Sequence, residues 1–172
     1  DDTSNRTNPN GASGDMSRYT LGGRFWGKNG NWDYEAMLAG QWGTWAGDTI
    51  HAWAWTVDGG YTFAERPWQP RVGAAFDFAS GDSNPRAGST AGTFDQLFPL
   101  GHAWLGLIDV IGRQNMNAFN LNLTAWPVPK KVNARLAWHT YWLNAKEDFQ
   151  YNAGGAPGRR DPTGNSGREV GQ

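Results

Sequence analysis

Arginines and acidic residues recur along this 172-residue sequence on one side of an alternating pattern. Arginine presents a planar guanidinium that can hold a carboxylate through two hydrogen bonds, so arginines spread along one surface suit an anionic ligand. Nearby carboxylates can instead pair with the arginines, which would leave a lattice of ion pairs without a ligand. Both interpretations apply to the same candidates, which we predict to line a water-filled passage: Arg18, Arg24, Asp33, Glu35, Asp58, Arg71, Asp77, Arg135 and His139.

The evidence for a metal site in the sequence is weak. The stretch SGDSNPRAGST at 80–90 could place Asp82 and Asn84 around Ca²⁺, which prefers oxygen ligands. It lacks the full acidic spacing of a calcium loop, so an ordinary Gly/Pro turn is favoured. The three histidines share no short spacing with one another, and we expect His102 to pack within a loop rather than to bind metal.

Signals for catalysis or for nucleic-acid binding are also weak. Asp33 and Glu35 lie two residues apart, which places both carboxylates on one strand face as in an acid and base pair, but strand neighbours of this kind are common by chance. No nucleophile elbow or phosphate-binding loop is present, and there is no cysteine. The net charge of −1 produces no field that would attract nucleic acid. The residues therefore give no strong signal for catalysis, and we expect no nucleic-acid partner.

Alternation with a period of two residues predicts the elements that carry the candidates. In IHAWAWTVDGGYTF, at 50–63, one parity holds two Trp, a Val, a Tyr and a Phe, while the other holds small and polar residues. A strand sends alternate side chains to opposite faces, so each such stretch has an apolar and a polar face. The pattern predicts six strands, at 17–27, 32–44, 50–63, 70–79, 116–126 and 132–143.

The polar parity of these strands carries every candidate charge, whereas the central positions of the apolar parity carry none. So many charges on one face need water or mutual pairing and cannot form a dry core. The sequence is rich in Gly (24 residues) and Trp (11 residues), has a mean hydropathy of −0.66, and holds no apolar run long enough for a membrane-spanning helix. This combination favours a transmembrane β-barrel with its apolar face in lipid and its polar face toward a lumen.

The connections between the predicted strands alternate in length. Short links rich in Gly, Asn or Pro alternate with longer ones, as in outer-membrane barrels with periplasmic turns and extracellular loops. The predicted short turns lie at 27–31, 64–70 and 127–131, and the longer links at 43–49, at about 80–115 and at about 145–168. We expect the last two to be long external loops.

The segment 76–115 carries a resemblance to a known family. Its motifs ASGD, FDQLFPLGH and GLIDVIGRQN, in this order, resemble the alginate export family of outer-membrane barrels, and the ending GREVGQ resembles the approach to a late strand in these proteins. The resemblance implies a single-chain, antiparallel, up-and-down barrel of 18 strands that passes an anionic polysaccharide outward. It implies neither an enzyme nor a cofactor. It also implies the outer-membrane lipid bilayer, the polymer and periplasmic export proteins as partners.

Six strands are too few to close a water-filled barrel. We therefore expect residues 1–172 to form a single partial barrel domain, an internal piece toward the C-terminal side of a longer protein. Two other classes stay open on the residues alone: a soluble β-sandwich that binds carbohydrate through surface Trp, and a β-sandwich glycan hydrolase. A sandwich would bury the aromatic face against a second sheet and would normally contain more Leu, Ile and Val.

Overall fold

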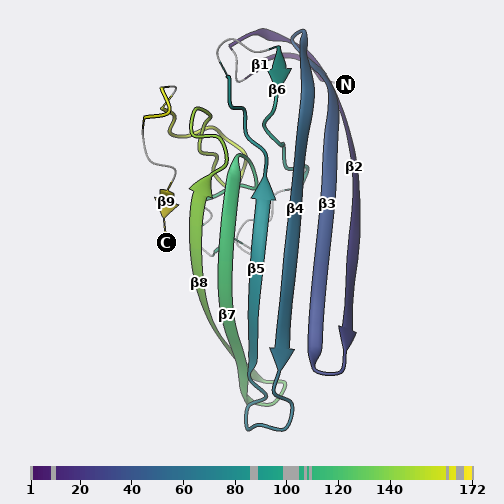
Figure 1. Cartoon of the computed structure of the whole chain (residues 1–172), viewed down its shortest axis with the longest axis vertical. Coiled ribbons are helices and arrows are strands. Elements are labelled where there is room, and N and C mark those ends of the chain that lie inside the picture. Colours follow the sequence, from purple (N-terminus) through teal and green to yellow (C-terminus); the bar gives the residue numbers. More distant parts are fainter. Residues whose placement is uncertain are drawn as a thin grey trace.

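A computed structural model describes residues 2–8, 11–85, 89–98, 105–106, 108, 110–161, 163–165 and 169–171. These residues form one sheet, in which the long neighbouring strands are antiparallel and follow the chain order (Figure 1). The strands are β1 (Asp2–Thr7), β2 (Ser13–Asn29), β3 (Trp32–Trp45), β4 (Asp48–Thr62), β5 (Arg71–Ala79), β6 (Thr90–Ala91), β7 (Met116–Val128), β8 (Val132–Leu143) and β9 (Glu169–Gly171).

All six predicted strands are present, as β2, β3, β4, β5, β7 and β8. The sheet is open: β1 and β9 end the path of paired strands, and β6 pairs with β4 in the one parallel ladder recorded among the described residues. Alternation did not reveal β1, β6 and β9, because these strands span six, two and three residues. No helix within the described ranges is long and apolar enough to cross a membrane.

The predicted long link at 43–49 is wrong. Strand β3 continues to Trp45 and β4 begins at Asp48, so only two residues make the turn. Ala46 and Gly47 both have positive φ, at 51° and 90°, which is the signature of a type I′ hairpin. The Thr-Trp-Ala-Gly-Asp stretch lacks the Asn-Gly signal that marks such turns.

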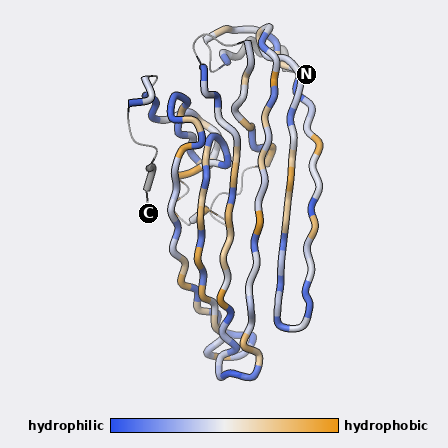
Figure 2. The backbone as a smooth tube through the Cα atoms, viewed as in Figure 1, coloured by the Kyte–Doolittle hydropathy of each residue, from blue (hydrophilic) through white to orange (hydrophobic). Residues whose placement is uncertain are grey.

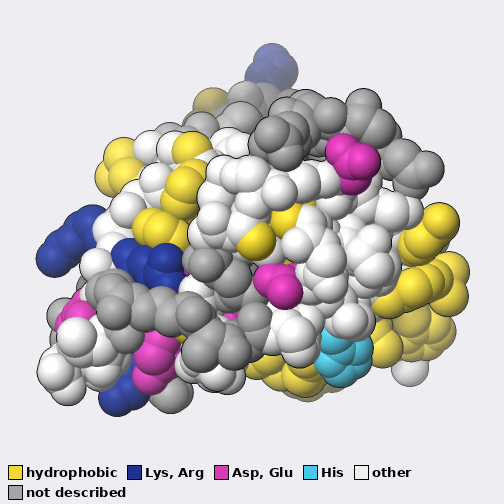
Figure 3. Space-filling view, turned by 90° about the horizontal axis from the view of Figure 1, so that it is seen from above, with side chains coloured by type: hydrophobic (Ala, Val, Ile, Leu, Met, Phe, Trp, Pro, Cys, Tyr) yellow, Lys and Arg dark blue, Asp and Glu magenta, His cyan; other side chains and the backbone are white. Residues whose placement is uncertain are grey.

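The two faces of the sheet differ as the alternation predicts. Figure 2 shows hydrophobic and hydrophilic positions alternating along the strands. The apolar parity, called here the outer face, leaves large side chains uncovered: Leu21 is 70% exposed, Leu38 58% and Leu136 72%. Seen from the loop end, hydrophobic side chains stand at the right-hand rim of the molecule, on the side of β2 and β3 (Figure 3). No second sheet covers this face in the described part of the chain, unlike in a β-sandwich.

Aromatic pairs cross the outer face from strand to strand. Ring centroids lie 5.3 Å apart for Trp55 and Phe76, and 4.9 Å apart for Trp32 and Tyr61. Such cross-strand pairs stabilise a sheet by about 0.2–1 kcal/mol each. On the outer face, aromatic contacts therefore stabilise the pairing of neighbouring strands, although nothing in the described chain packs on top of this face.

The polar parity, called here the inner face, is covered at one end. The described residues of segment 80–115 fold back over it, and their apolar side chains pack against strand side chains in a buried core: Ala52, Ala54, Ala79, Phe94, Leu105, Ile111, Met116, Ala118 and Tyr141. Gln41, 2% exposed, donates to the Asp95 carbonyl at 2.7 Å and accepts from the Asp95 amide at 2.9 Å. The assignment of this segment to the external side of a membrane stays a prediction.

Two buried side chains join segment 80–115 to the residues that follow β8. The Asn115 amide donates to the carbonyls of Ala145 and Phe149 and accepts from the Ala145 amide, at 2.7–2.9 Å. The Asp148 carboxylate accepts hydrogen bonds from the Thr93 hydroxyl at 2.5 Å and from the Asp82 amide at 3.0 Å. We call this set of contacts the loop clasp.

Candidate anion-binding groove

All nine predicted candidates share the inner face. In the strand register Glu35 lies opposite Asp58, and Arg135 lies opposite Thr124, which in turn lies opposite Arg71. The remaining candidates have the same parity on their strands. A one-residue slip in any strand would have moved its charges to the other face, so the pairing fixes their common side.

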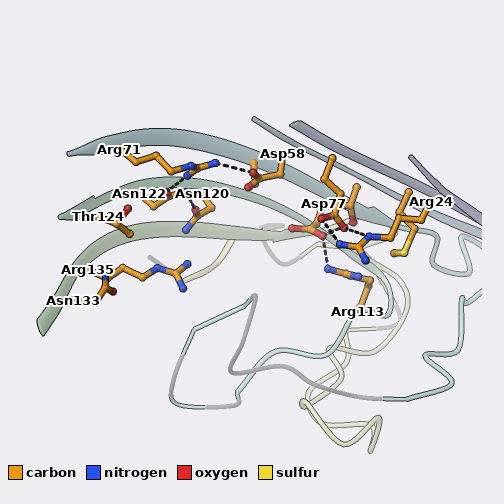
Figure 4. A pocket seen from close by; sticks show the side chains of 14 residues that line it. Arg24, Asp58, Arg71, Asp77, Arg113, Asn120, Asn122, Thr124, Asn133 and Arg135 are labelled. Atoms are coloured by element: carbon orange, nitrogen blue, oxygen red, sulfur yellow. Dashed lines mark hydrogen bonds and ion pairs between the residues drawn. The ribbon is translucent and has the colours of Figure 1, made fainter. Parts of the chain in front are cut away.

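Next to the covered end, the inner face is hollowed into an open groove with a volume of about 590 Å³. Side chains of β2, β3, β4, β5, β7 and β8 point into it, together with one arginine from segment 80–115 (Figure 4). Its charged and amide lining is Arg24, Glu35, Asp58, Arg71, Asp77, Arg113, Asn120, Asn122, Asn133 and Arg135. Arg18, Asp33 and His139 are on the inner face but do not line the groove.

Arg71 is the hub of the polar contacts. Its guanidinium binds Asp33 with Nη2 to Oδ1 at 2.5 Å and Nε to Oδ2 at 2.9 Å, and it reaches Asp58 at 3.3 Å. Its Nη1 donates to the Asn122 Oδ1 at 2.8 Å. Space for this group comes from two glycines that face each other across the strands, because a Cβ on Gly60 or on Gly73 would lie within 2.3 Å of it.

Arg24 and Glu35 form a second unit. Nε and Nη2 of Arg24 donate to the two carboxylate oxygens of Glu35, at 2.8 Å and 2.7 Å, which is the bidentate geometry that fixes a guanidinium in orientation. The same guanidinium lies 4.6 Å from the centre of the Trp26 ring. Arg24 is therefore held from two sides.

Asp77 is the buried acidic member of the groove. It accepts hydrogen bonds from the Thr56 hydroxyl at 2.7 Å and from Arg113 Nη2 at 2.6 Å. Arg113 was not predicted as a candidate, although it is part of the GLIDVIGRQN motif. The two-residue alternation cannot predict its position, because Arg113 lies outside the strands and reaches the sheet through the fold of its segment. There its backbone amide donates to Gln96 Oε1 at 2.9 Å.

Arg135 differs from the other arginines of the groove. It lines the groove and is exposed, and no ion pair is recorded for it among the residues that the structure describes. Arg18, by contrast, pairs with Asp95 at the covered end. His139 lies 3.0 Å from the Asn120 amide and stacks on Tyr141, so it packs beside the groove.

The segment with the weak calcium signal forms a turn. Asp82 Oδ1 accepts the Asn84 amide at 2.9 Å, and the Asp82 amide belongs to the loop clasp. No group of three or more His, Asp or Glu suited to a metal ion is found within the described ranges. His102 lies outside the described residues.

Comparison with known proteins decides the family. The sequence model described as alginate export matches residues 1–172, the whole chain. This chain belongs to the alginate export family. No curated protein and no solved structure matches it. Proteins of the alginate export family are outer-membrane porins that export alginate, so membership places the chain among transport proteins rather than enzymes.

Proposed function

We propose that this sheet is part of the wall of a larger, closed outer-membrane barrel of 18 strands, with its inner face toward the lumen. The exposed apolar outer face supports this arrangement, because uncovered Leu, Phe and Trp side chains across neighbouring strands are stable in lipid. An open sheet in lipid would leave edge N–H and C=O groups unpaired, so the remaining strands of the complete protein would have to close it.

The height of the apolar band agrees with a bilayer. On the outer face it runs from the row of Trp32 and Tyr61 to the row of Trp42 and His51. The chain from Trp32 to Trp42 rises by roughly 33 Å at about 3.3 Å per residue. A strand tilt of about 40° reduces this to roughly 25 Å, the usual height of the apolar band of such barrels.

We further propose that the groove is a stretch of the path along which an anionic polysaccharide passes. Its single supporting observation is the gathering of four arginines in one open groove, of which three are held by carboxylates while Arg135 has no recorded ion pair in the described part of the chain. Paired arginines attract an anion only weakly, and weak, repeated sites allow a polymer to enter and to leave. In this arrangement the turns at 27–31, 64–70 and 127–131 face the periplasm, while the two-residue turn at Ala46 and Gly47 and segments 80–115 and 145–168 face outward.

Conductance of the complete protein in planar bilayers tests this proposal. Arg135→Glu should lower the permeability ratio of anions to cations about fivefold, because reversing one charge beside a water-filled path changes the energy of an anion relative to that of a cation by roughly 1 kcal/mol. Arg135→Lys should keep the preference. Arg66→Glu, the same charge change in the turn between β4 and β5, serves as a control outside the groove. Unchanged selectivity in Arg135→Glu would remove the groove from the path.

Two neighbouring substitutions on β3 test whether the outer face contacts lipid. Leu38→Arg places a charge on the outer face and should block membrane assembly, at a cost of about 2–4 kcal/mol near the bilayer centre. Its chain neighbour Met37 lines the groove, so Met37→Arg should assemble. Leu121→Arg should behave as Leu38→Arg does. Normal assembly of both outer-face variants would argue against lipid contact.

A further inference from the structure

One aromatic side chain of the inner face has no role in the groove or in the covered core. Trp26 lies opposite Glu35 in the register, so it points to the polar side of the sheet. It is nevertheless 62% exposed. An indole is largely apolar, so exposing it on a charged and solvated face costs free energy that burial in lipid or in a core would avoid.

The surroundings of Trp26 hold it in place. The guanidinium of Arg24 lies over its ring at 4.6 Å, and Glu35 fixes that guanidinium through two hydrogen bonds. The contact covers only part of the indole, because most of its surface stays exposed. Arg24 thus contacts the Trp26 ring while most of the indole stays open to solvent.

Trp26 lies near the end of the groove that is closer to the short turns. It lies one pleat beyond Arg24 toward the short turn that joins β2 and β3, so it lies next to the groove on the side of this turn. Lys28 follows on the same face, opposite Asp33. A chain entering from the turn end would meet Lys28, then Trp26, then Arg24: a cation, an aromatic ring and a second cation.

We propose that Trp26 is a sugar-stacking subsite at the turn-end entrance of the groove, for a pyranose ring of a uronate polymer. The C–H groups on the flat side of a pyranose form an apolar surface that packs on an indole, while the carboxylates at the ring edge meet Arg24 and Lys28. Stacking provides attraction that does not depend on charge, which the arginines alone cannot supply. This inference rests on the proposed passage of an anionic polysaccharide.

The test uses block of the conductance of the complete protein by two oligosaccharides of equal length. One is an oligouronate, and the other is the same oligomer with its carboxyl groups reduced to alcohols. Trp26→Ala should weaken block by both oligomers, by about threefold to tenfold, because the lost contact is with the ring and not with the charge. Arg135→Gln should weaken block by the oligouronate alone.

The structure offers a close control for the stacking residue. Trp32 is 61% exposed, sits at the same turn end and points to the outer face, so Trp32→Ala should leave both blocking constants unchanged. Trp26→Tyr, which keeps a ring, should restore most of the block. Equal block of wild type and Trp26→Ala would overturn the subsite and leave the pathway intact. If neither oligomer blocks the wild-type protein, both the subsite and the proposed pathway are overturned.

Discussion

The inner face contains two regions that share strands and parity but differ in character. At the loop end, Ala54 and Ala118 are 0% and 2% exposed beneath segment 80–115, and Tyr141 donates to the Leu105 carbonyl at 2.6 Å. Toward the turn end the same face carries Arg71, Asp58 and their neighbours in an open groove. On one strand face, a buried core therefore lies where segment 80–115 covers it, and a charged open groove lies where no described residue covers it.

On β4 the difference follows the size and charge of the inner-face side chains. On β4 the inner positions run from Ala52 and Ala54 through Thr56 to Asp58, so small residues lie where the segment packs and the charge lies where water reaches. Small side chains let the segment approach the backbone, and a charge at those positions would be buried without a partner. The gradient along β4, and not the alternation alone, sets where the covered core gives way to the open groove.

The largest effect is expected from placing the same charge in each of the two regions. Ala54→Arg buries a charge under segment 80–115 and should abolish assembly of the folded barrel, because an unpaired buried charge costs several kcal/mol. Ala75→Arg, in the groove, should assemble. Heat-modifiable mobility on a gel measures both. Equal assembly of the two variants would show that the loop end is not a dry core.

A second test removes the clasp that holds the cover in place. Asn115→Ala removes three hydrogen bonds to backbone groups of Ala145 and Phe149 and should destabilise the covered end by about 3 kcal/mol. Hydrogen exchange of the amides in 144–161 should speed up accordingly. Asn133→Ala, which loses one exposed contact of 3.3 Å, serves as the control. Equal exchange in the two variants would remove Asn115 from the clasp.

In the open region the same kind of deletion should matter less. Arg71→Gln breaks contacts to Asp33 and Asp58, but water can solvate these carboxylates, so the stability loss should be about 1 kcal/mol. Denaturant unfolding from micelles measures it. A loss as large as that of Asn115→Ala would mean that the groove is as dry as the loop end.

The smallest expected effect is a pH dependence of the loop clasp. Burial raises the pKa of Asp148 above 3.8, more than its hydrogen bonds lower it. The folded clasp therefore keeps a proton that the unfolded segment releases, and its stability falls as pH rises from 3.8 through the raised pKa. Asp148→Asn should remove this slope from the exchange of the Asp82 amide, after correction for intrinsic rates. An unchanged slope would assign it to another group.

Alternation was enough to predict the six long strands and the common side of all nine candidates. It works because a strand with one apolar and one polar face fixes its own register. It could not predict that segment 80–115 folds inward, because the reciprocal bonds of Gln41 and Asp95 join residues far apart in the chain. Arg113 was missed for the same reason. The two-residue turn at Ala46 and Gly47 was missed because it lacks an Asn-Gly pair.

The most direct test of the account is the accessibility of spin labels placed one by one along β3 of the complete protein in lipid vesicles. Labels at 34, 36, 38 and 42 should collide with oxygen dissolved in lipid, and labels at 33, 35 and 37 with a water-soluble nickel reagent. A label at Gln41 should be shielded from both, because segment 80–115 covers it. Loss of the alternation, or its inversion, would contradict a sheet with one face in lipid and the other toward a lumen.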